Sequence, residues 1–191
     1  MCSSDLTLEK AASKTSAYEA QRVPGLLQTP AYARALAQAD PSLKDSAAWD
    51  SAAEATLARQ RAILTEGGPE VHLLIGQAAL HQQIGSAAVM GEQLSAMAQG
   101  AEDSGAVTVQ VLPFDAGAHA AAAEGSLAIL QFDQAPDLGL VHLGAIGGGV
   151  CLEPQNDLGS YTWAFERLSR CALSPKRSAL MLRDIAGFQP S

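Results

Sequence analysis

The chain has few cysteines, and their number and spacing exclude two classes of protein. Its 191 residues include three cysteines, Cys2, Cys151 and Cys171, an odd number without the paired spacing of a disulfide scaffold or a zinc ribbon. We expect unpaired thiols in a reducing cytoplasm. Cys171 is a candidate nucleophile, but its position on the apolar stripe of an expected helix favours a buried and inert thiol.

Basic residues and long apolar runs are also scarce. Twelve Lys and Arg stand against 20 Asp and Glu, which gives a formal net charge of −8. Nucleic-acid binding requires clustered basic side chains, and the one cluster, Lys176, Arg177 and Arg183, is flanked by Asp184. No run approaches the roughly 18 apolar residues of a membrane span, and the N-terminus lacks a secretion signal. We therefore expect a cytoplasmic protein that contacts neither nucleic acid nor membrane.

The composition and the N-terminal third of the chain indicate a folded domain that begins with helices. With 48% hydrophobic and 17% charged residues, the chain can form one globular domain over residues 1–191. Apolar spacing predicts helices over Leu6–Ala20 and Ser46–Thr65. Thr29 and Pro30 read as the N-cap and first position of a further helix that extends through Ala39.

After Glu66–Pro69 the pattern changes from helical spacing to short apolar segments typical of strands. The expected strands are Val71–Ile75, Val107–Pro113, Ser126–Phe132, and a hairpin of Leu138–Leu143 with Val150–Glu153. Helical segments are expected at Gln77–Gln83, Gly91–Asp103, Ser160–Leu173 and Pro175–Ile185. This order predicts a single α+β domain, in which the N-terminal helices pack on a mixed sheet together with C-terminal helices.

Residues 18–35, YEAQRVPGLLQTPAYARA, resemble the opening motif of the domain that follows the helix-turn-helix in actinobacterial Xre-type regulators. Further matches occur in order over residues 8–182, at Arg59–Arg61, Gln77–Leu80, Ile84–Gly85, Gln93–Leu94, Val109–Phe114, Gly117–His119 and Ala172–Pro175 with Ser178. The resemblance implies an interaction or sensing domain. Such regulators carry about 60 to 80 residues of DNA-binding helices before this motif. Because only seventeen residues precede Tyr18, we expect this chain to lack the DNA-binding part.

Two positions depart from the family pattern. The family usually has an acidic residue where this chain has Gln77, and Tyr-x-Glu where it has His142-Leu143-Gly144. Two carboxylates are therefore absent, and an imidazole, which titrates near neutral pH, replaces a phenol. If both positions line one cavity, these changes suit a neutral and largely apolar ligand.

Two histidines are candidate catalytic residues. His119 lies in a loop of small residues between two expected strands, where binding groups often collect. A loop histidine that is exposed or caps a turn is the favoured alternative. His142 lies within an expected strand, where a hydrogen-bonded core histidine is the alternative. In an enzyme, one of them would be the proton shuttle.

The candidate substrate-binding residues are Gln77, Gln110, Gln131, Tyr18 and Gln28. The first three would converge with His142 in an apolar bowl if their faces agree; otherwise the strand glutamines lie on a solvated sheet face. Tyr18 and Gln28 bracket the Pro24-Gly25 break, which could instead dock the N-terminal helices on the sheet. The spacing of the four histidines disfavours a metal site, the glycine run 144–149 lacks the rest of a phosphate loop, and we expect no cofactor.

Two functions from different classes fit these residues. The first is a cofactor-free cyclase or isomerase of actinobacterial specialised metabolism, acting on a neutral, apolar small molecule. The second is a non-catalytic ligand-sensing or regulatory partner protein. The protein could form a homodimer or bind a regulator, and the sequence does not decide between these two assemblies.

Overall fold

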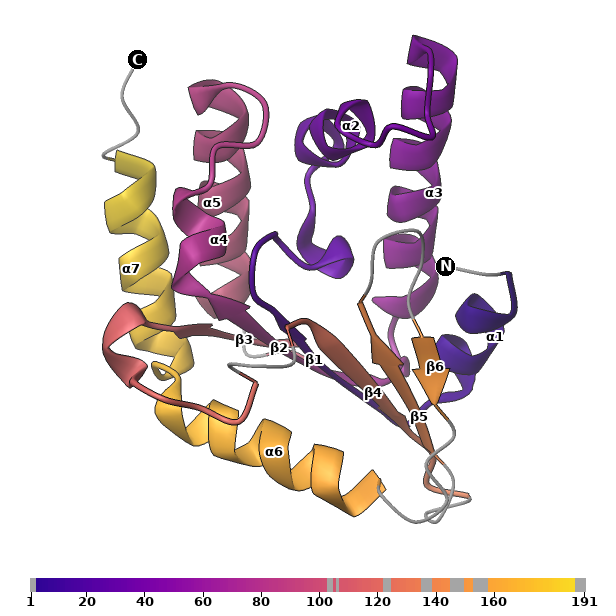
Figure 1. Ribbon diagram of the computed structural model, residues 1–191, viewed down its shortest axis with the longest axis vertical. Coiled ribbons are helices and arrows are strands. Elements are labelled where there is room, and N and C mark those ends of the chain that lie inside the picture. Colours follow the sequence, from indigo (N-terminus) through magenta and orange to yellow (C-terminus); the bar gives the residue numbers. More distant parts are fainter. Residues whose placement is uncertain are drawn as a thin grey trace.

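Six strands form one mixed sheet at the centre of the computed structural model, which describes residues 3–102, 105, 107–121, 125–134, 139–144, 150–152 and 158–187 (Figure 1). The strands are β1 (Lys14–Glu19), β2 (Glu70–Gly76), β3 (Val107–Leu112), β4 (Leu127–Gln131), β5 (Gly139–Leu143) and β6 (Val150–Leu152), in the spatial order β3-β2-β1-β4-β5-β6. β2 is parallel to β1 and β3, whereas β4 pairs antiparallel with β1 and β5, and β6 with β5.

Seven α-helices surround this sheet in the described part of the chain. They are α1 (Ser3–Ala11), α2 (Pro30–Gln38), α3 (Ser46–Ile63), α4 (Gln77–His81), α5 (Ala87–Glu102), α6 (Leu158–Cys171) and α7 (Pro175–Gly187), with short 3-10 turns η1 (Gly25–Leu27) and η2 (Phe114–Ala116). Figure 1 shows α6 along one face of the sheet and α2, α3 and α5 over the other. The predicted α+β domain is thereby confirmed. Of the glycine run 144–149, only Gly144 is among the described residues.

The core has a part on each face of the sheet. On the face of α6, Leu74, Ile129 and Val141 pack against Phe165 and Leu168. On the other face, one cluster joins β2 and β3 to α5 and α7, and it includes Ile75, Val109, Met90, Leu94 and Leu182. A smaller cluster joins η1, α3 and β2 through Leu26, Ile63, Val71 and Leu73. Among the described helices, none combines the length and hydropathy that a membrane span requires.

The predicted start of a helix at Thr29 and Pro30 is confirmed by the observed cap of α2. Thr29 precedes α2 in an extended conformation, its hydroxyl accepts a hydrogen bond from the Tyr32 N–H at 3.4 Å, and Pro30 is the first helical residue. Pro at this position loses no helical hydrogen bond, because the first amides of a helix have no intrahelical acceptor. A local sequence signal therefore fixes where the polypeptide enters α2.

The predicted helix over Leu6–Ala20 is wrong in its second half. α1 ends at Ala11, and Lys14–Glu19 forms β1, which hydrogen-bonds to β2 on one side and β4 on the other. Thr15 and Tyr18 have side chains that suit a pleated strand, and pairing on both edges outweighs a weak helical pattern. The correction matters for function, because β1 is the strand that carries the opening motif into the centre of the sheet.

Candidate functional site

A cavity of about 650 Å³ lies on the face of the sheet opposite α6, between strands β1, β4, β5 and β6 and helices α1, α2 and α3. One row of the sheet crosses its floor: Leu73, Ala17, Ala128, His142 and Cys151 are successive partners on β2, β1, β4, β5 and β6, and all five line the cavity. Side chains of paired residues share a face of the sheet. Because the middle of the row carries only methyl groups, it leaves space above the strands.

The opposite wall is also built from small side chains. Ala33 and Ala37 of α2 and Ala52 and Ala55 of α3 line the cavity where these helices face the sheet. Between them, the loop of the opening motif contributes its residues from Pro24 to Gln28 except Leu27. The cavity therefore lies between two alanine-rich surfaces, and the motif loop forms part of its rim.

Gln60, on α3, holds this loop through two hydrogen bonds to its backbone. Its Nε2 donates to the carbonyl oxygens of Gly25, at 2.7 Å, and Gln28, at 2.8 Å. Gln28 is buried, and its own Nε2 donates to the Val23 carbonyl at 2.8 Å. The loop thus has a fixed shape, although η1 is only three residues long.

Gln93, on α5, holds the other end of the loop. Its Oε1 accepts from the Thr29 N–H and its Nε2 donates to the Leu27 carbonyl, both at 2.7 Å, and the side chain is completely buried. The Tyr32 hydroxyl accepts from the Val23 N–H at 3.1 Å. Burial raises the pKa of Tyr32, so its phenol stays neutral. Gln60 and Gln93 belong to separate matching segments of the sequence, and the fold brings both to the opening motif.

The charged side chains of the cavity lining have partners already. Glu9 accepts two hydrogen bonds from Arg59, at 2.6 and 2.5 Å, and the Glu9 side chain is 9% exposed. Glu19 accepts a hydrogen bond from the Ser126 hydroxyl at 2.7 Å and forms an ion pair with Arg22 at 3.4 Å.

Asp40 and Thr15 are two further polar residues of the lining. Asp40 accepts hydrogen bonds from the backbone and hydroxyl of Ser42, which lower the pKa of its carboxyl group. Thr15, on the floor, has a buried hydroxyl without a hydrogen-bonding partner among the described residues. Among the described residues, the lining therefore has one buried hydroxyl without a partner, at Thr15, and an imidazole at His142, whereas its carboxylates and guanidinium groups take part in ion pairs or hydrogen bonds.

Of the predicted site residues, His142 and Gln28 line the cavity. Tyr18 and His119 lie elsewhere: Tyr18 is buried with the α6-facing cluster, and the His119 ring meets it edge to face with centroids 6.1 Å apart. The His119 Nδ1 is buried and has no hydrogen-bonding partner in the described part of the chain. The two candidate catalytic histidines are thus on opposite faces of the sheet and cannot share one substrate.

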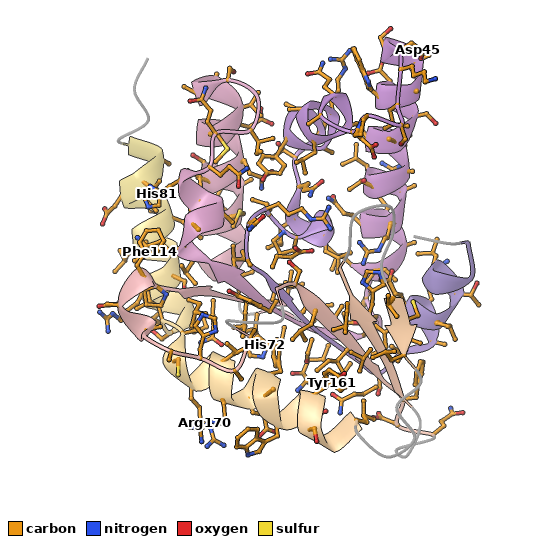
Figure 2. The ribbon with its side chains drawn as sticks, viewed as in Figure 1. Asp45, His72, His81, Phe114, Tyr161 and Arg170 are labelled. Atoms are coloured by element: carbon orange, nitrogen blue, oxygen red, sulfur yellow. The ribbon has the colours of Figure 1, made fainter. Side chains whose placement is uncertain are left out.

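Gln110 belongs to a hydrogen-bonded network under α6. Its Nε2 donates to the Leu173 carbonyl at 2.7 Å, and its Oε1 accepts from the Ser169 hydroxyl at 2.9 Å and from His72 at 2.6 Å. This assignment makes Nε2 the protonated nitrogen of His72, which lies beside α6 in Figure 2. The His72 ring meets the Phe165 ring edge to face. Burial lowers the pKa of His72, although the hydrogen bond that His72 donates to Gln110 acts in the opposite direction. The network joins β2 and β3 to α6, which is a structural role.

Gln131 and Gln77 do not reach the cavity lining. Gln131 lies two residues after Ile129 on β4, so its side chain is on the same face of the sheet as Ile129, the face that α6 covers. Gln77 accepts a hydrogen bond from the Phe114 N–H at 2.9 Å and thereby joins α4 to η2. Beside it, the rings of His81 and Phe114 stack with centroids 5.9 Å apart, on the side of the molecule away from α3 (Figure 2). The expected convergence of Gln77, Gln110 and Gln131 with His142 is not formed.

Several residues of the cavity were missed by the sequence reasoning. Glu9, Thr15, Ser126 and Cys151 were not singled out as site residues, and Arg59 was noted only within a segment that resembles the family. A strand in place of the predicted helix would have put Thr15 and Ala17 on one face, and the hairpin register would have placed Cys151 beside His142. Cys171, in contrast, is exposed at the last residue of α6 and is not a buried thiol. No group of three potential metal ligands occurs in the described segments.

Comparisons with known proteins identify the family of the chain. No curated protein matches it, and no solved structure matches it. A family model described as "Domain of unknown function (DUF5753)" matches residues 4–184, a range that includes the six described strands and the cavity lining. The chain therefore belongs to the DUF5753 family.

Proposed function

We propose that this protein binds a small, neutral, largely apolar organic molecule in the cavity on the sheet. The observation that carries the proposal is the alanine-lined floor and wall around a volume of about 650 Å³. Small-molecule sites in proteins commonly enclose about 300 to 1,000 Å³ and combine an apolar lining with a few polar groups. The volume and the lining both fit this description.

The paired charges support a neutral ligand. A cation or an anion would have to compete with Arg59 for Glu9 or with Glu19 for Arg22, and would leave a charge without its partner. A neutral ligand leaves both pairs intact. It can form hydrogen bonds with His142 and can pack against Leu130 and Leu140.

The resemblance to the domain behind the helix-turn-helix of actinobacterial Xre-type regulators supports a sensing role in the cytoplasm. In this role, ligand binding would change how the domain contacts a regulator. The motif loop is suited to it, because Gln60 and Gln93 connect the loop at the cavity to α3 and α5. The net charge of −8 supports a protein partner and not nucleic acid.

Catalysis without a cofactor is a second candidate function, and the position of His142 favours it. Its imidazole lies on the cavity floor, and imidazole can exchange protons near neutral pH. A cyclase or isomerase acting on a neutral metabolite would need little more than this group and a shaped apolar cavity. This candidate shares the binding site with the first.

The test is a fluorescence titration with N-phenyl-1-naphthylamine, a neutral apolar probe. We expect saturable binding to the parent protein. Ala128→Phe, which adds a ring at the centre of the cavity floor, should weaken binding at least about tenfold, since it removes much of the apolar contact. Ala96→Phe, at an exposed position of α5, is the matched control and should leave the affinity unchanged.

Thermal unfolding of each variant establishes that it is folded under the titration conditions. Equal probe affinity of Ala128→Phe and the parent would mean that the cavity is not where the probe binds. Weak, non-saturable binding to the parent would count against the proposal as a whole.

A further inference from the structure

His142 and Cys151 are direct cross-strand partners on β5 and β6. Side chains of such partners lie on the same face, with Cβ atoms about 4.5 to 5.5 Å apart. Both residues line the cavity, and Cys151 is exposed. The hairpin therefore places a thiol and an imidazole next to one another at the edge of a cavity.

A thiol next to an imidazole can act as a nucleophile with its base. The thiolate is the reactive form of cysteine, and a neighbouring imidazole can accept the thiol proton. An unassisted thiol is only a few per cent ionised at pH 7, so the gain in reactivity from a base is large. Cys171 is exposed at the end of helix α6 and is not among the residues that line the cavity.

We propose that Cys151 and His142 form a reactive thiol–imidazole pair that adds reversibly to electron-poor alkenes bound in the cavity, that is, to α,β-unsaturated carbonyl compounds. This inference deepens the proposed function and rests on it, because the cavity must first bind the alkene. It also names the chemical class of the ligand.

The addition needs no further reactant. The thiol proton passes to the His142 imidazole, the Cys151 sulfur forms a bond to the β-carbon, and the π pair moves towards the carbonyl. The imidazolium then returns the proton to the α-carbon. In the reverse direction a base removes this proton, the carbon–sulfur bond breaks, and the thiol and alkene are restored. Rotation about the intermediate single bond before elimination gives the other geometric isomer, so the same steps amount to a cofactor-free isomerisation.

The lining favours this class of electrophile. α,β-Unsaturated ketones and esters are neutral and mostly apolar, as the paired charges and the alanines of the cavity require. Acyl transfer would in addition need donors aimed at a developing oxyanion and a route for the leaving group. Conjugate addition needs a thiolate and one proton donor, which are the two groups that the hairpin supplies.

N-ethylmaleimide is the probe, since it is itself a neutral, electron-poor alkene. Its rates of addition to Cys151 and Cys171 are measured in the same full-length chain at pH 7, by mass spectrometry of peptides. We expect Cys151 to react at least about fivefold faster than Cys171. Proton transfer to His142 increases the fraction of Cys151 that is thiolate, and the lower nucleophilicity of a more acidic thiol offsets part of this gain. Chain unfolded in urea provides the reference, in which the ratio of the rates should approach one.

His142→Gln and His142→Asn should both lower the rate at Cys151 to that at Cys171, without changing the rate at Cys171. The inference is overturned if Cys151 in the folded parent reacts no faster than Cys171, or if both folded variants keep the parent ratio. Saturation with N-phenyl-1-naphthylamine should also protect Cys151 and not Cys171. Fast, His142-dependent addition in a protein that does not bind the naphthylamine would uphold the pair and overturn the proposed function.

Discussion

The guanidinium group of Arg59 donates two hydrogen bonds to the carboxylate of Glu9, and this contact joins α1 to α3 beside the cavity. The two side chains are 21% and 9% exposed, so the pair is largely withdrawn from water. A Cβ added at Gly25 would lie 3.0 Å from Arg59 Nη1, so the motif loop passes close to the same guanidinium group. One ion pair therefore connects three segments of the cavity wall.

Glu9→Gln should lower the free energy of unfolding by about 2 to 4 kcal/mol, because it leaves the Arg59 charge largely buried and unpaired. Glu54→Gln is the matched control: Glu54 also pairs with an arginine, Arg61, but both side chains are 63% exposed. Its effect should stay within about 0.5 kcal/mol. Urea unfolding of the two variants measures the difference, and equal losses would contradict a special role for the Glu9–Arg59 pair.

Gly76→Ala should destabilise the protein by about 1 to 3 kcal/mol, since crowding in a packed region forces the backbone to move. A Cβ at Gly76 would lie 2.9 Å from the Ala20 carbonyl oxygen, where β1 and β2 end together. Gly91, within α5, has nothing within 4 Å of such an atom, so Gly91→Ala should stabilise the protein by up to about 1 kcal/mol. Thermal unfolding distinguishes the opposite signs, and a stabilising Gly76→Ala would be inconsistent with the packing at the ends of these strands.

Gln93→Leu should cost about 2 to 4 kcal/mol, because the Thr29 N–H and the Leu27 carbonyl would both lose their partner in a buried place. It should also weaken naphthylamine binding, since the motif loop would lose its connection to α5. Gln99→Leu, at an exposed position of the same helix, should change neither quantity measurably. Denaturant unfolding and the probe titration check the two effects, and loss of stability with unchanged binding would separate the loop from the cavity.

Acidification should destabilise the protein through His72. Burial holds the pKa of His72 in the folded state below its ordinary value of 6.5. As the pH falls below about 6.5, the unfolded chain binds a proton at this residue before the folded protein does. The free energy of unfolding therefore decreases with falling pH until the folded pKa is passed, and this contribution is regained above about pH 6.5.

His72→Gln should make the free energy of unfolding less dependent on pH between about 5 and 7, since it removes the group that titrates differently in the two states. His81→Gln, at an exposed position, is the control. Urea unfolding at a series of pH values gives both slopes. If His72→Gln and the parent show the same slope, the buried imidazole is not the source of the pH dependence.

Local signals predicted much of the fold. Thr29 and Pro30 marked the start of α2 correctly, because a cap depends on residues next to one another. β1 was not predicted, because its six residues acquire their conformation from pairing with β2 and β4, and these partners are distant in the sequence.

The site was harder to predict, since it depends on which face each strand residue takes. His142 and Gln28 were found, whereas Gln110 and Gln131 were expected beside His142 and lie under α6. A shift of one residue in register moves a side chain to the other face, and no sequence signal fixed the register of these strands. Cys151 was overlooked for the same reason.

The most direct test of a ligand-binding cavity is methyl NMR of the folded protein during titration with N-phenyl-1-naphthylamine. The methyl groups of Ala17, Ala128, Leu130 and Leu140 report on the cavity, and those of Leu74 and Leu168 report on the core under α6. If the cavity binds the probe, the first set shows saturable shift changes and the signals of the second set stay unchanged. Changes confined to the second set, or none in either set at saturating probe, would contradict binding in the cavity.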